Sequence, residues 1–266
     1  MKTALTIAGS DSSGGAGIQA DLKTFSVLGV FGMSAITAVT AQNTLGVKES
    51  LELSAKLVRN QIDTTAGDIQ VDATKTGMLA NAEIVEAVAD ALKANKLLPY
   101  VCDPVMRSKS GSVLLKPDAA SALKEKLFPL ATVVTPNRRE AAALVGMDVN
   151  ALTSVAAAKD VARRLADTGA KAIVVKGIEV GEEFIDVFFD GKEFYELTGK
   201  KQPSEKSHGS GCAFSAAITA GLATGKTLLD SIDQAKNLVN MAIQYSDGQG
   251  RGTAPVNVLA FAPKKK

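Results

Sequence analysis

The sequence predicts an α/β fold built on a mostly parallel sheet. Its strand candidates are short and nearly continuous in apolar residues, which is typical of strands covered on both faces. These runs alternate with longer helical patterns, and such alternation implies right-handed crossovers between parallel strands. Near residue 180 the alternation stops, and Asp190-Gly191 indicates a two-residue turn between two strand patterns. We therefore expect a hairpin at one end of the sheet.

Each expected element follows from an apolar run and the turn signals beside it. Strands are expected at residues 3–8, 33–40, 73–77, 100–103, 132–135 and 172–176, with the hairpin strands at 183–189 and 192–197. Helices are expected at residues 17–28, 55–66, 82–94, 118–126, 138–145, 154–168, 211–224 and 228–245. No repeat, Pro-rich linker or low-complexity stretch divides the chain, so we expect a single domain over residues 1–266.

Composition and charge argue against several kinds of partner. The 266 residues are 46% apolar and 22% charged, as in ordinary globular proteins, and the net charge of +2 gives no electrostatic case for nucleic acid or an anionic membrane. Two cysteines, Cys102 and Cys212, do not suggest a disulfide framework, and the apolar run at residues 4–8 is too short for a signal sequence or a membrane span. We expect a cytoplasmic protein whose basic tail, residues 264–266, is a solvated end.

A glycine-rich loop follows the first strand, where ligands bind in open parallel sheets. Residues 8–17 read AGSDSSGGAG, which lacks the Gly-Lys-Ser/Thr of a Walker A loop. A flexible turn with a helix cap is the plain interpretation, but so many small residues favour contact with a ligand. Asp21, in the helix that follows, would on its own be a solvated carboxylate.

A second loop, residues 207–215 (SHGSGCAFS), opens a helix of small residues. Glycines before a helix let backbone N–H groups face an anion, so Gly209, Ser210 and Gly211 could hold a transferring phosphoryl group. Cys212 would lie in the first turn, a position that lowers the pKa of a thiol and could make it a base for a substrate hydroxyl. A small buried cysteine at a helix start is an equal alternative. His208 is expected to order the loop.

Polar residues follow three further strands, in DPVM at 103–106, TPNRRE at 135–140 and VVKG at 174–177. Asn137 and Glu140 share a helix face and could hold hydrated Mg²⁺ against phosphates, although each could instead be a helix cap or a surface charge. One motif is rejected. Residues 221–227 (GLATGKT) resemble a P-loop but have three residues between the glycines and follow a helix, so we interpret them as a helix end.

Taken together, these motifs resemble those of a known family, the hydroxymethylpyrimidine/phosphomethylpyrimidine kinases of thiamine biosynthesis within the ribokinase-like superfamily. The shared segments run through nearly the whole chain: residues 5–11 (LTIAGSD), 13–24 (SGGAGIQADLKT), 40–44 (TAQNT), 75–79 (KTGML), 103–106 (DPVM), 135–137 (TPN) with Glu140 and Ala141, and 208–212 (HGSGC). Each is weak alone, and together they are highly specific.

The resemblance implies a three-layer α/β/α fold and two successive phosphorylations, with ATP and Mg²⁺ as cofactors and a homodimer as the assembly. The first phosphorylation would act on the hydroxymethyl group of 4-amino-5-hydroxymethyl-2-methylpyrimidine, and the second would convert the monophosphate to the diphosphate. By match, the pyrimidine pocket would be lined by Gly9, Asp21, Gln42, Met78 and Val105. Gly209, Ser210, Gly211 and the base Cys212 would form the catalytic loop, while Asn137, Lys176, Asp103 and Glu140 would serve ATP and the metal.

Three places depart from the family pattern, and three alternatives stay open. Ser210 replaces the usual Thr and keeps its hydroxyl, Ile178 replaces the second glycine of the usual Lys-Gly-Gly, and Arg138-Arg139 replaces a typically less charged pair. A pyridoxal kinase is the nearest alternative, because its substrate is also a hydroxymethylated ring. A non-catalytic ligand sensor is disfavoured by the intact loop, and a sugar kinase is disfavoured by Cys212 where Asp is expected.

Overall fold

Nine strands form one mixed sheet in the computed structural model, which describes residues 1–108, 111, 114–201 and 204–262, so the predicted solvated tail lies outside the described residues. The strands are β1 (Thr3–Asp11), β2 (Phe31–Asn43), β3 (Gly46–Glu52), β4 (Ala73–Thr76), β5 (Tyr100–Cys102), β6 (Val133–Val134), β7 (Ile173–Val180), β8 (Glu183–Phe189) and β9 (Phe194–Lys200). Their order is β3-β2-β1-β4-β5-β6-β7-β8-β9. The six strands from β2 to β7 in this order are parallel, and β3, β8 and β9 pair antiparallel at the two edges.

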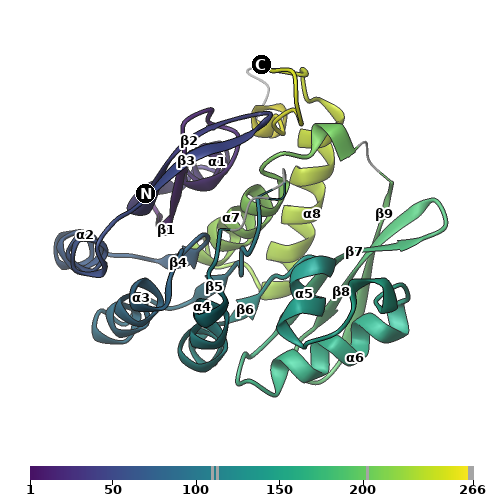
Figure 1. Ribbon diagram of the computed structural model, residues 1–266, viewed down its shortest axis with the longest axis horizontal. Coiled ribbons are helices and arrows are strands. Elements are labelled where there is room, and N and C mark those ends of the chain that lie inside the picture. The colour runs from purple at the N-terminus through teal and green to yellow at the C-terminus, as the bar shows by residue number, and fades with distance from the viewer. Residues whose placement is uncertain (109–110, 112–113, 202–203, 263–266) are drawn as a thin grey trace.

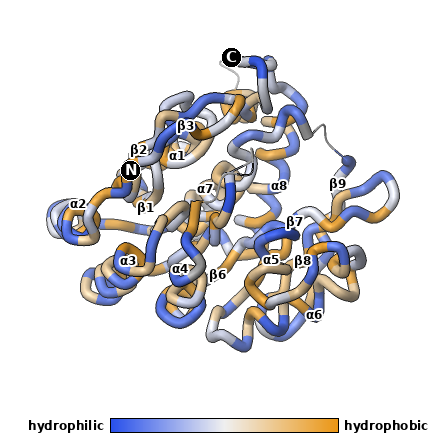
Figure 2. Tube along the Cα trace, in the orientation of Figure 1, coloured by the Kyte–Doolittle hydropathy of each residue, from blue (hydrophilic) through white to orange (hydrophobic). Residues whose placement is uncertain are grey.

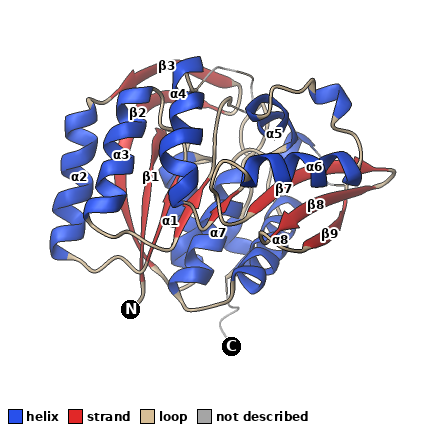
Figure 3. Cartoon of the chain, turned by 90° about the horizontal axis from the view of Figure 1, so that it is seen from below, coloured by secondary structure: helices blue, strands red, loops and turns tan. Residues whose placement is uncertain are grey.

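Helices cover both faces of the sheet. They are α1 (Gly17–Val27), α2 (Ala55–Asp68), α3 (Ala82–Ala94), α4 (Pro117–Ala122), α5 (Arg138–Leu144), α6 (Val155–Ala166), α7 (Ser210–Ala223) and α8 (Leu228–Gln244). One core joins α2 to α6 with the sheet, and two smaller cores join α1, α7 and α8 with its other face. Figures 1 and 3 show the row of strands between these two groups of helices. The predicted three-layer α/β/α fold is confirmed.

The central strands are short and apolar because both of their faces are buried. In β7, Val174 packs into the core of α7 and α8, while its neighbours Ile173 and Val175 pack into the core on the opposite face. Along the helices, hydrophobic and hydrophilic residues are interleaved (Figure 2), as expected where one side of a helix meets the sheet. In the described part of the chain, no helix is both long enough and apolar enough to cross a membrane.

Three local features differ from the sequence prediction. Strand β3 was not predicted, because most of its side chains are exposed at the sheet edge and show no apolar alternation. The β8–β9 turn has four residues between Phe189 and Phe194, because the Asp190 carboxylate accepts hydrogen bonds from the backbone N–H groups of Lys192 and Glu193 and closes a wider loop. The helix expected at 118–126 is α4 followed by a π-helical turn, Leu123–Leu127.

The rejected P-loop at residues 221–227 is a helix end, as predicted. Helix α7 stops at Ala223, and Gly225 follows with a left-handed φ of 83°. Thr227 then caps α8 by accepting a hydrogen bond from the backbone N–H of Asp230.

Candidate active site

The loop that leads into α7 depends on glycine at one position. Gly209 has a left-handed φ of 79°, and a Cβ on it would collide with the carbonyl oxygen of Gly15. This close approach joins the α7 loop to the glycine-rich loop after β1. In the first turn of α7, the backbone N–H groups of Gly211 and Cys212 have no carbonyl of their own helix to bind. The helix start can therefore receive an anion.

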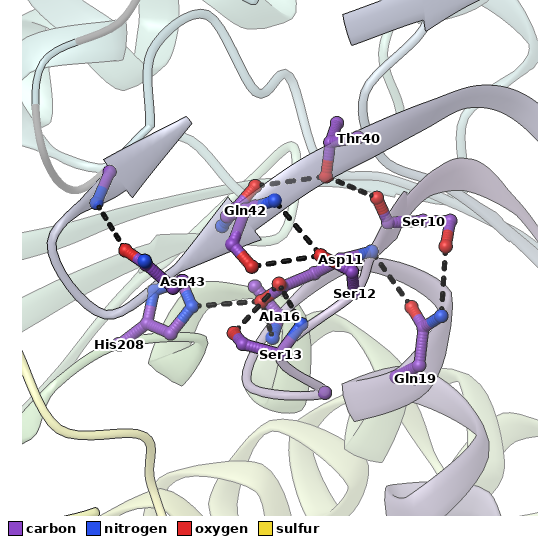
Figure 4. A network of polar contacts seen from close by, with 12 residues as sticks. Ser10, Asp11, Ser12, Ser13, Ala16, Gln19, Thr40, Gln42, Asn43 and His208 are labelled. Carbon is purple, nitrogen blue, oxygen red and sulfur yellow. Dashed lines mark hydrogen bonds and ion pairs between the residues drawn. The ribbon is translucent and has the colours of Figure 1, made fainter. Parts of the chain in front are cut away.

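An aspartate–histidine pair fastens the two loops together (Figure 4). His208 Nε2 lies 2.9 Å from Asp11 Oδ2, and both side chains are buried. Asp11 also accepts hydrogen bonds from Ser13 and from the backbone N–H of Ala16. Burial alone would raise the pKa of Asp11, but these bonds outweigh it and hold the pKa below its usual range. His208 therefore orders the loop, in agreement with its predicted role.

Cys212 lies where α1 and α7 begin. Its thiol accepts a hydrogen bond from the backbone N–H of Gly17, the first residue of α1. Although the residue keeps some exposed surface, burial raises the pKa of the thiol to about 12, while the positive charge of Lys75 opposes the rise. The predicted lowering of this pKa by the helix start is therefore wrong. Burial outweighs the positive charge of Lys75 and the hydrogen bond from Gly17.

Beneath Cys212 lies a buried ion pair that joins α1 to β4. Lys75 Nζ lies 2.8 Å from Asp21 Oδ1, Thr6 Oγ1 donates to Asp21 Oδ2 at 2.6 Å, and both charged side chains are 0% exposed. The carboxylate of Asp21 is thus neither solvated nor open to a ring pocket, because Thr6 and Lys75 occupy its two oxygens. Burial favours the neutral forms, so it raises the pKa of Asp21; the pKa of Lys75 is raised because nearby negative charges outweigh its own burial.

Asp103 and Lys176 lie at the start of α7. Asp103 is 2% exposed and accepts hydrogen bonds from Ser215 Oγ at 3.1 Å and Thr135 Oγ1 at 3.3 Å. Lys176 Nζ lies 3.5 Å from Asp103 Oδ1. A Cβ on Gly211 would lie 3.8 Å from Lys176 Nζ and 4.0 Å from Asp103 Oδ2. A cation and a carboxylate, predicted from two different strand ends, therefore face the same helix start.

Asn137 and Glu140 form the capping box of α5. The Asn137 side chain accepts from the backbone N–H of Glu140 at 3.0 Å, and Glu140 Oε2 accepts from the backbone N–H of Asn137 at 2.9 Å. The helix-cap alternative is thus present in the structure. Burial and the charge of Asp103 raise the pKa of Glu140 to about 8, while Lys176 opposes the rise. Two acidic side chains therefore lie near each other at this site, with the Lys176 ammonium beside Asp103.

Two acidic side chains close together suit a divalent cation. Within the described residues, no group of three or more acidic, histidine or cysteine side chains could hold a metal by itself. Mg²⁺ keeps several waters and binds nucleotide phosphates with only one or two protein carboxylates. Asp103 and Glu140 fit that mode of binding.

The remaining predicted pocket residues fall into two places. Gly9 and Met78 touch, since a Cβ on Gly9 would lie 2.9 Å from the Met78 sulfur, and Val105 follows Asp103 at the end of β5. Gln42 lies on β2, where Thr40 Oγ1 donates to its side-chain oxygen at 3.3 Å and Ser12 Oγ bonds its backbone (Figure 4). It lines a hollow together with His208. An adjoining open depression of about 450 Å³ is also lined by Gln42.

Comparison with known proteins decides the family. The profile described as "Phosphomethylpyrimidine kinase" matches residues 11–257. The hydroxymethylpyrimidine/phosphomethylpyrimidine kinase of Bacillus subtilis is 45% identical over 260 residues, covering 97% of this chain and 95% of that one. That of Rhizobium meliloti is 48% identical over 254 residues, covering 94% of each. The chain belongs to the hydroxymethylpyrimidine/phosphomethylpyrimidine kinase family.

Solved structures resemble this family member over nearly its full length. A pyridoxal kinase from Bacillus subtilis in complex with ADP has a TM-score of 0.89 at 40% identity and covers 98% of each chain. The pyridoxal kinase of Staphylococcus aureus in complex with pyridoxal has a TM-score of 0.91 at 36% identity, covering 100% of this chain and 96% of that one. A phosphomethylpyrimidine kinase from Clostridium difficile has a TM-score of 0.79 at 40% identity, covering 91% of this chain and 100% of that one.

Two buried cations near the kinase site were not predicted as site residues. Lys75 lies in a four-residue strand that is otherwise Ala and Thr, and a charge in so short a buried run is a usable signal. Lys236 lies on α8 and contacts the site through Asp186, a link that no local pattern reveals. The departure at Ile178 is accommodated, because its side chain is fully buried in the core of α2 to α6.

Proposed function

We propose that this chain transfers the terminal phosphoryl group of ATP to the hydroxymethyl group of 4-amino-5-hydroxymethyl-2-methylpyrimidine, and then phosphorylates the resulting monophosphate with a second ATP. The observation that carries the proposal is the start of α7, where Gly211, Lys176 and Asp103 lie together beside Cys212. Family membership supports the reaction class and the two substrates.

In this proposal the anion site at the start of α7 provides most of the rate acceleration. Phosphoryl transfer spreads negative charge over the transferred group, and the first-turn N–H groups of α7 and the Lys176 ammonium are already oriented toward it. Ser210 adds a hydroxyl at the same helix start. Because these groups are held by the fold before the reaction, they need no reorganisation during it.

Cys212 takes the proton of the substrate hydroxyl as the oxygen–phosphorus bond forms and ADP leaves. A thiol with a pKa of about 12 is protonated at neutral pH, so it must lose that proton before it can act as a base. The buried ammonium of Lys75 and the N–H of Gly17 both favour the thiolate. Mg²⁺, held by Asp103, Glu140 and the nucleotide, would neutralise phosphate charge when bound.

The ring is placed between the two loops. Met78 and Val105 would contact its flat faces, and Gly9 lets the Met78 side chain lie close against the backbone of β1. Gln42 offers donors and an acceptor to ring nitrogen and exocyclic amine. Since Asp21 is enclosed, we propose that it supports this pocket from behind by holding Lys75, rather than by touching the ring.

Pyridoxal phosphorylation is the second candidate function. Solved structures of pyridoxal kinases match this chain with TM-scores of 0.89 to 0.91. A coupled ADP-release assay with Mg²⁺ tests both, offering the pyrimidine, its monophosphate and pyridoxal to the same enzyme. We expect turnover of the two pyrimidines. Efficient turnover of pyridoxal alone would contradict the pyrimidine assignment, and no release with any of the three would support a ligand sensor.

A homodimer is the expected assembly. At the β2–β3 edge, Val39 is 46% exposed and Leu51 is 66% exposed, and the two residues pair across the strands. An exposed apolar pair of this kind favours burial against another surface. Sedimentation equilibrium should give twice the chain mass of 27.5 kDa. A monomer at micromolar concentration would contradict this expectation.

A further inference from the structure

Strand β7 contains a bulge at the residue that faces the nucleotide site. Val175 pairs with Val187 and Ile178 pairs with Ile185, so two residues of β7 lie opposite one residue of β8. The two are Lys176 and Gly177, and the one is Asp186. A bulge of this kind bends the strand and turns a side chain away from its regular direction. Here it turns Lys176 toward the start of α7, where its Nζ lies 3.5 Å from Asp103 Oδ1 and 5.2 Å from the centre of the Phe214 ring.

The backbone of the bulge is satisfied by a side chain. Gly177 has a left-handed φ of 76°, and its N–H donates to Asp186 Oδ1 at 2.8 Å. Without that acceptor the N–H would lose its partner, because a bulge removes it from the strand ladder. On the other side of the bulge, the N–H of Lys176 donates to the carbonyl of Pro136 at 2.9 Å. Both backbone donors of the bulge are thus fixed.

Asp186 is in turn held by a cation from another layer. Lys236 on α8 donates to Asp186 Oδ2 at 2.7 Å and to the carbonyl of Leu197 on β9 at 2.9 Å. Side-chain exposure is only 11% for Lys236 and 10% for Asp186, so the pair is largely desolvated. A desolvated carboxylate whose two oxygens each accept a hydrogen bond has little freedom to move.

We infer that Asp186 and Lys236 are positioning residues, which hold the Lys176–Gly177 bulge in the shape that aims Lys176 at the nucleotide phosphates. The inference rests on the proposed role of Lys176 in binding ATP. Neither residue touches the site itself, and both act through the backbone of Gly177.

The test compares two double variants that remove the same charges. Asp186→Asn with Lys236→Met keeps an oxygen that can accept from Gly177, whereas Asp186→Leu with Lys236→Met removes it at similar volume. Binding of the ATP analogue AMP-PCP with Mg²⁺ is measured by isothermal titration calorimetry. The dissociation constant should be about tenfold larger than that of wild type for the leucine variant and within about twofold of wild type for the asparagine variant. Thermal unfolding of both variants checks that they are folded.

Combining each double variant with Lys176→Met completes a thermodynamic mutant cycle. If Asp186 acts through Lys176, the leucine variant should cause no further loss of affinity in the Lys176→Met background. Equal affinities of the leucine and asparagine variants, or losses that add in full, would overturn the inference while leaving the role of Lys176 intact. Unchanged binding by Lys176→Met alone would overturn the proposed role of Lys176 and this inference with it.

Discussion

Cys212 combines a predicted catalytic position with a thiol whose pKa is raised. Its hydrogen bond from Gly17 and the nearby charge of Lys75 favour the thiolate, yet burial raises the pKa to about 12. The anion site beside it needs no such activation. At the residue scale, we therefore propose that the α7 backbone and Lys176 contribute more to the rate than the thiol does.

Replacement of the thiol tests how large its share is. Cys212→Ala should fold and bind ATP but lose roughly 10²- to 10⁴-fold in kcat, the usual range for removal of a general base. Steady-state ADP release, together with AMP-PCP titration, measures both quantities. Turnover close to wild type would remove Cys212 from the base role and leave the anion site as the main contributor.

The raised thiol pKa gives a pH dependence with a definite sign. In a Cys102→Ala protein, Cys212 is the remaining cysteine, and the reactive form is the thiolate. With a pKa of about 12, its rate of alkylation by iodoacetamide should rise by about tenfold per pH unit from about pH 7 to pH 9.5 without a plateau. A plateau within that range would show that the pKa is not raised.

At the element scale, the two loops and their supporting elements are held together by two buried side-chain pairs. Asp11 with His208 ties the β1 loop to the α7 loop, and Asp21 with Lys75 ties α1 to β4. Both pairs are buried, so their geometry matters more than their net contribution to stability. Breaking either pair should disturb the site by shifting the loops or elements that the pair holds together.

Removal of one partner of the Asp21–Lys75 pair should be costly. Lys75→Met leaves a carboxylate that is 0% exposed without its cation, so we expect the free energy of unfolding to fall by about 3–5 kcal/mol. Asp21→Asn combined with Lys75→Met leaves no buried charge and should recover most of that loss. Urea unfolding measures all three proteins; equal losses in the single and double variants would contradict an electrostatic origin.

The turn before α7 allows a test of the backbone alone. Gly209→Ala adds one methyl group at a left-handed φ of 79°, where it would collide with the carbonyl of Gly15. We expect a loss of more than about 1 kcal/mol in unfolding free energy and a larger relative loss in kcat, because the loop must move. Gly225→Ala is the matched control: its φ is 83° and a Cβ there would meet nothing within 4 Å. Gly225→Ala should lose stability with little change in kcat, and equal kcat losses in both variants would contradict the role of the α7 loop.

Element boundaries follow the sequence where local signals are strong. Helix α3 has the predicted bounds, because its N-cap Asn81 and its apolar spacing are both local features. Strand β3 escaped prediction because it is stabilised by pairing with β2 rather than by burial of its own side chains. The site shows the same division. Gly209 and Cys212 lie in one short motif, whereas Lys75 and Asp21 are 54 residues apart and Asp186 and Lys236 are 50 apart. Such pairs become visible only when the sheet brings them together.

At the scale of the whole molecule, residues from several strands lie together at the carboxyl edge of the sheet. Asp103 follows β5, Asn137 follows β6 and Lys176 lies on β7, so parallel neighbours present them along one edge. Helix α7 packs on one face of the sheet, and its start lies beside Lys176 and Asp103 (Figure 1). The α/β/α architecture brings the separate short motifs that the chain shares with the family together into one site.

The location of the transferred phosphoryl group tests the central claim most directly. A crystal structure of this chain with AMP-PCP, Mg²⁺ and the hydroxymethylpyrimidine should place the γ-phosphate within about 3 Å of the backbone nitrogens of Gly211 and Cys212. The substrate hydroxyl should then face the Cys212 sulfur. A γ-phosphate bound elsewhere, with the start of α7 left to solvent, would contradict the account.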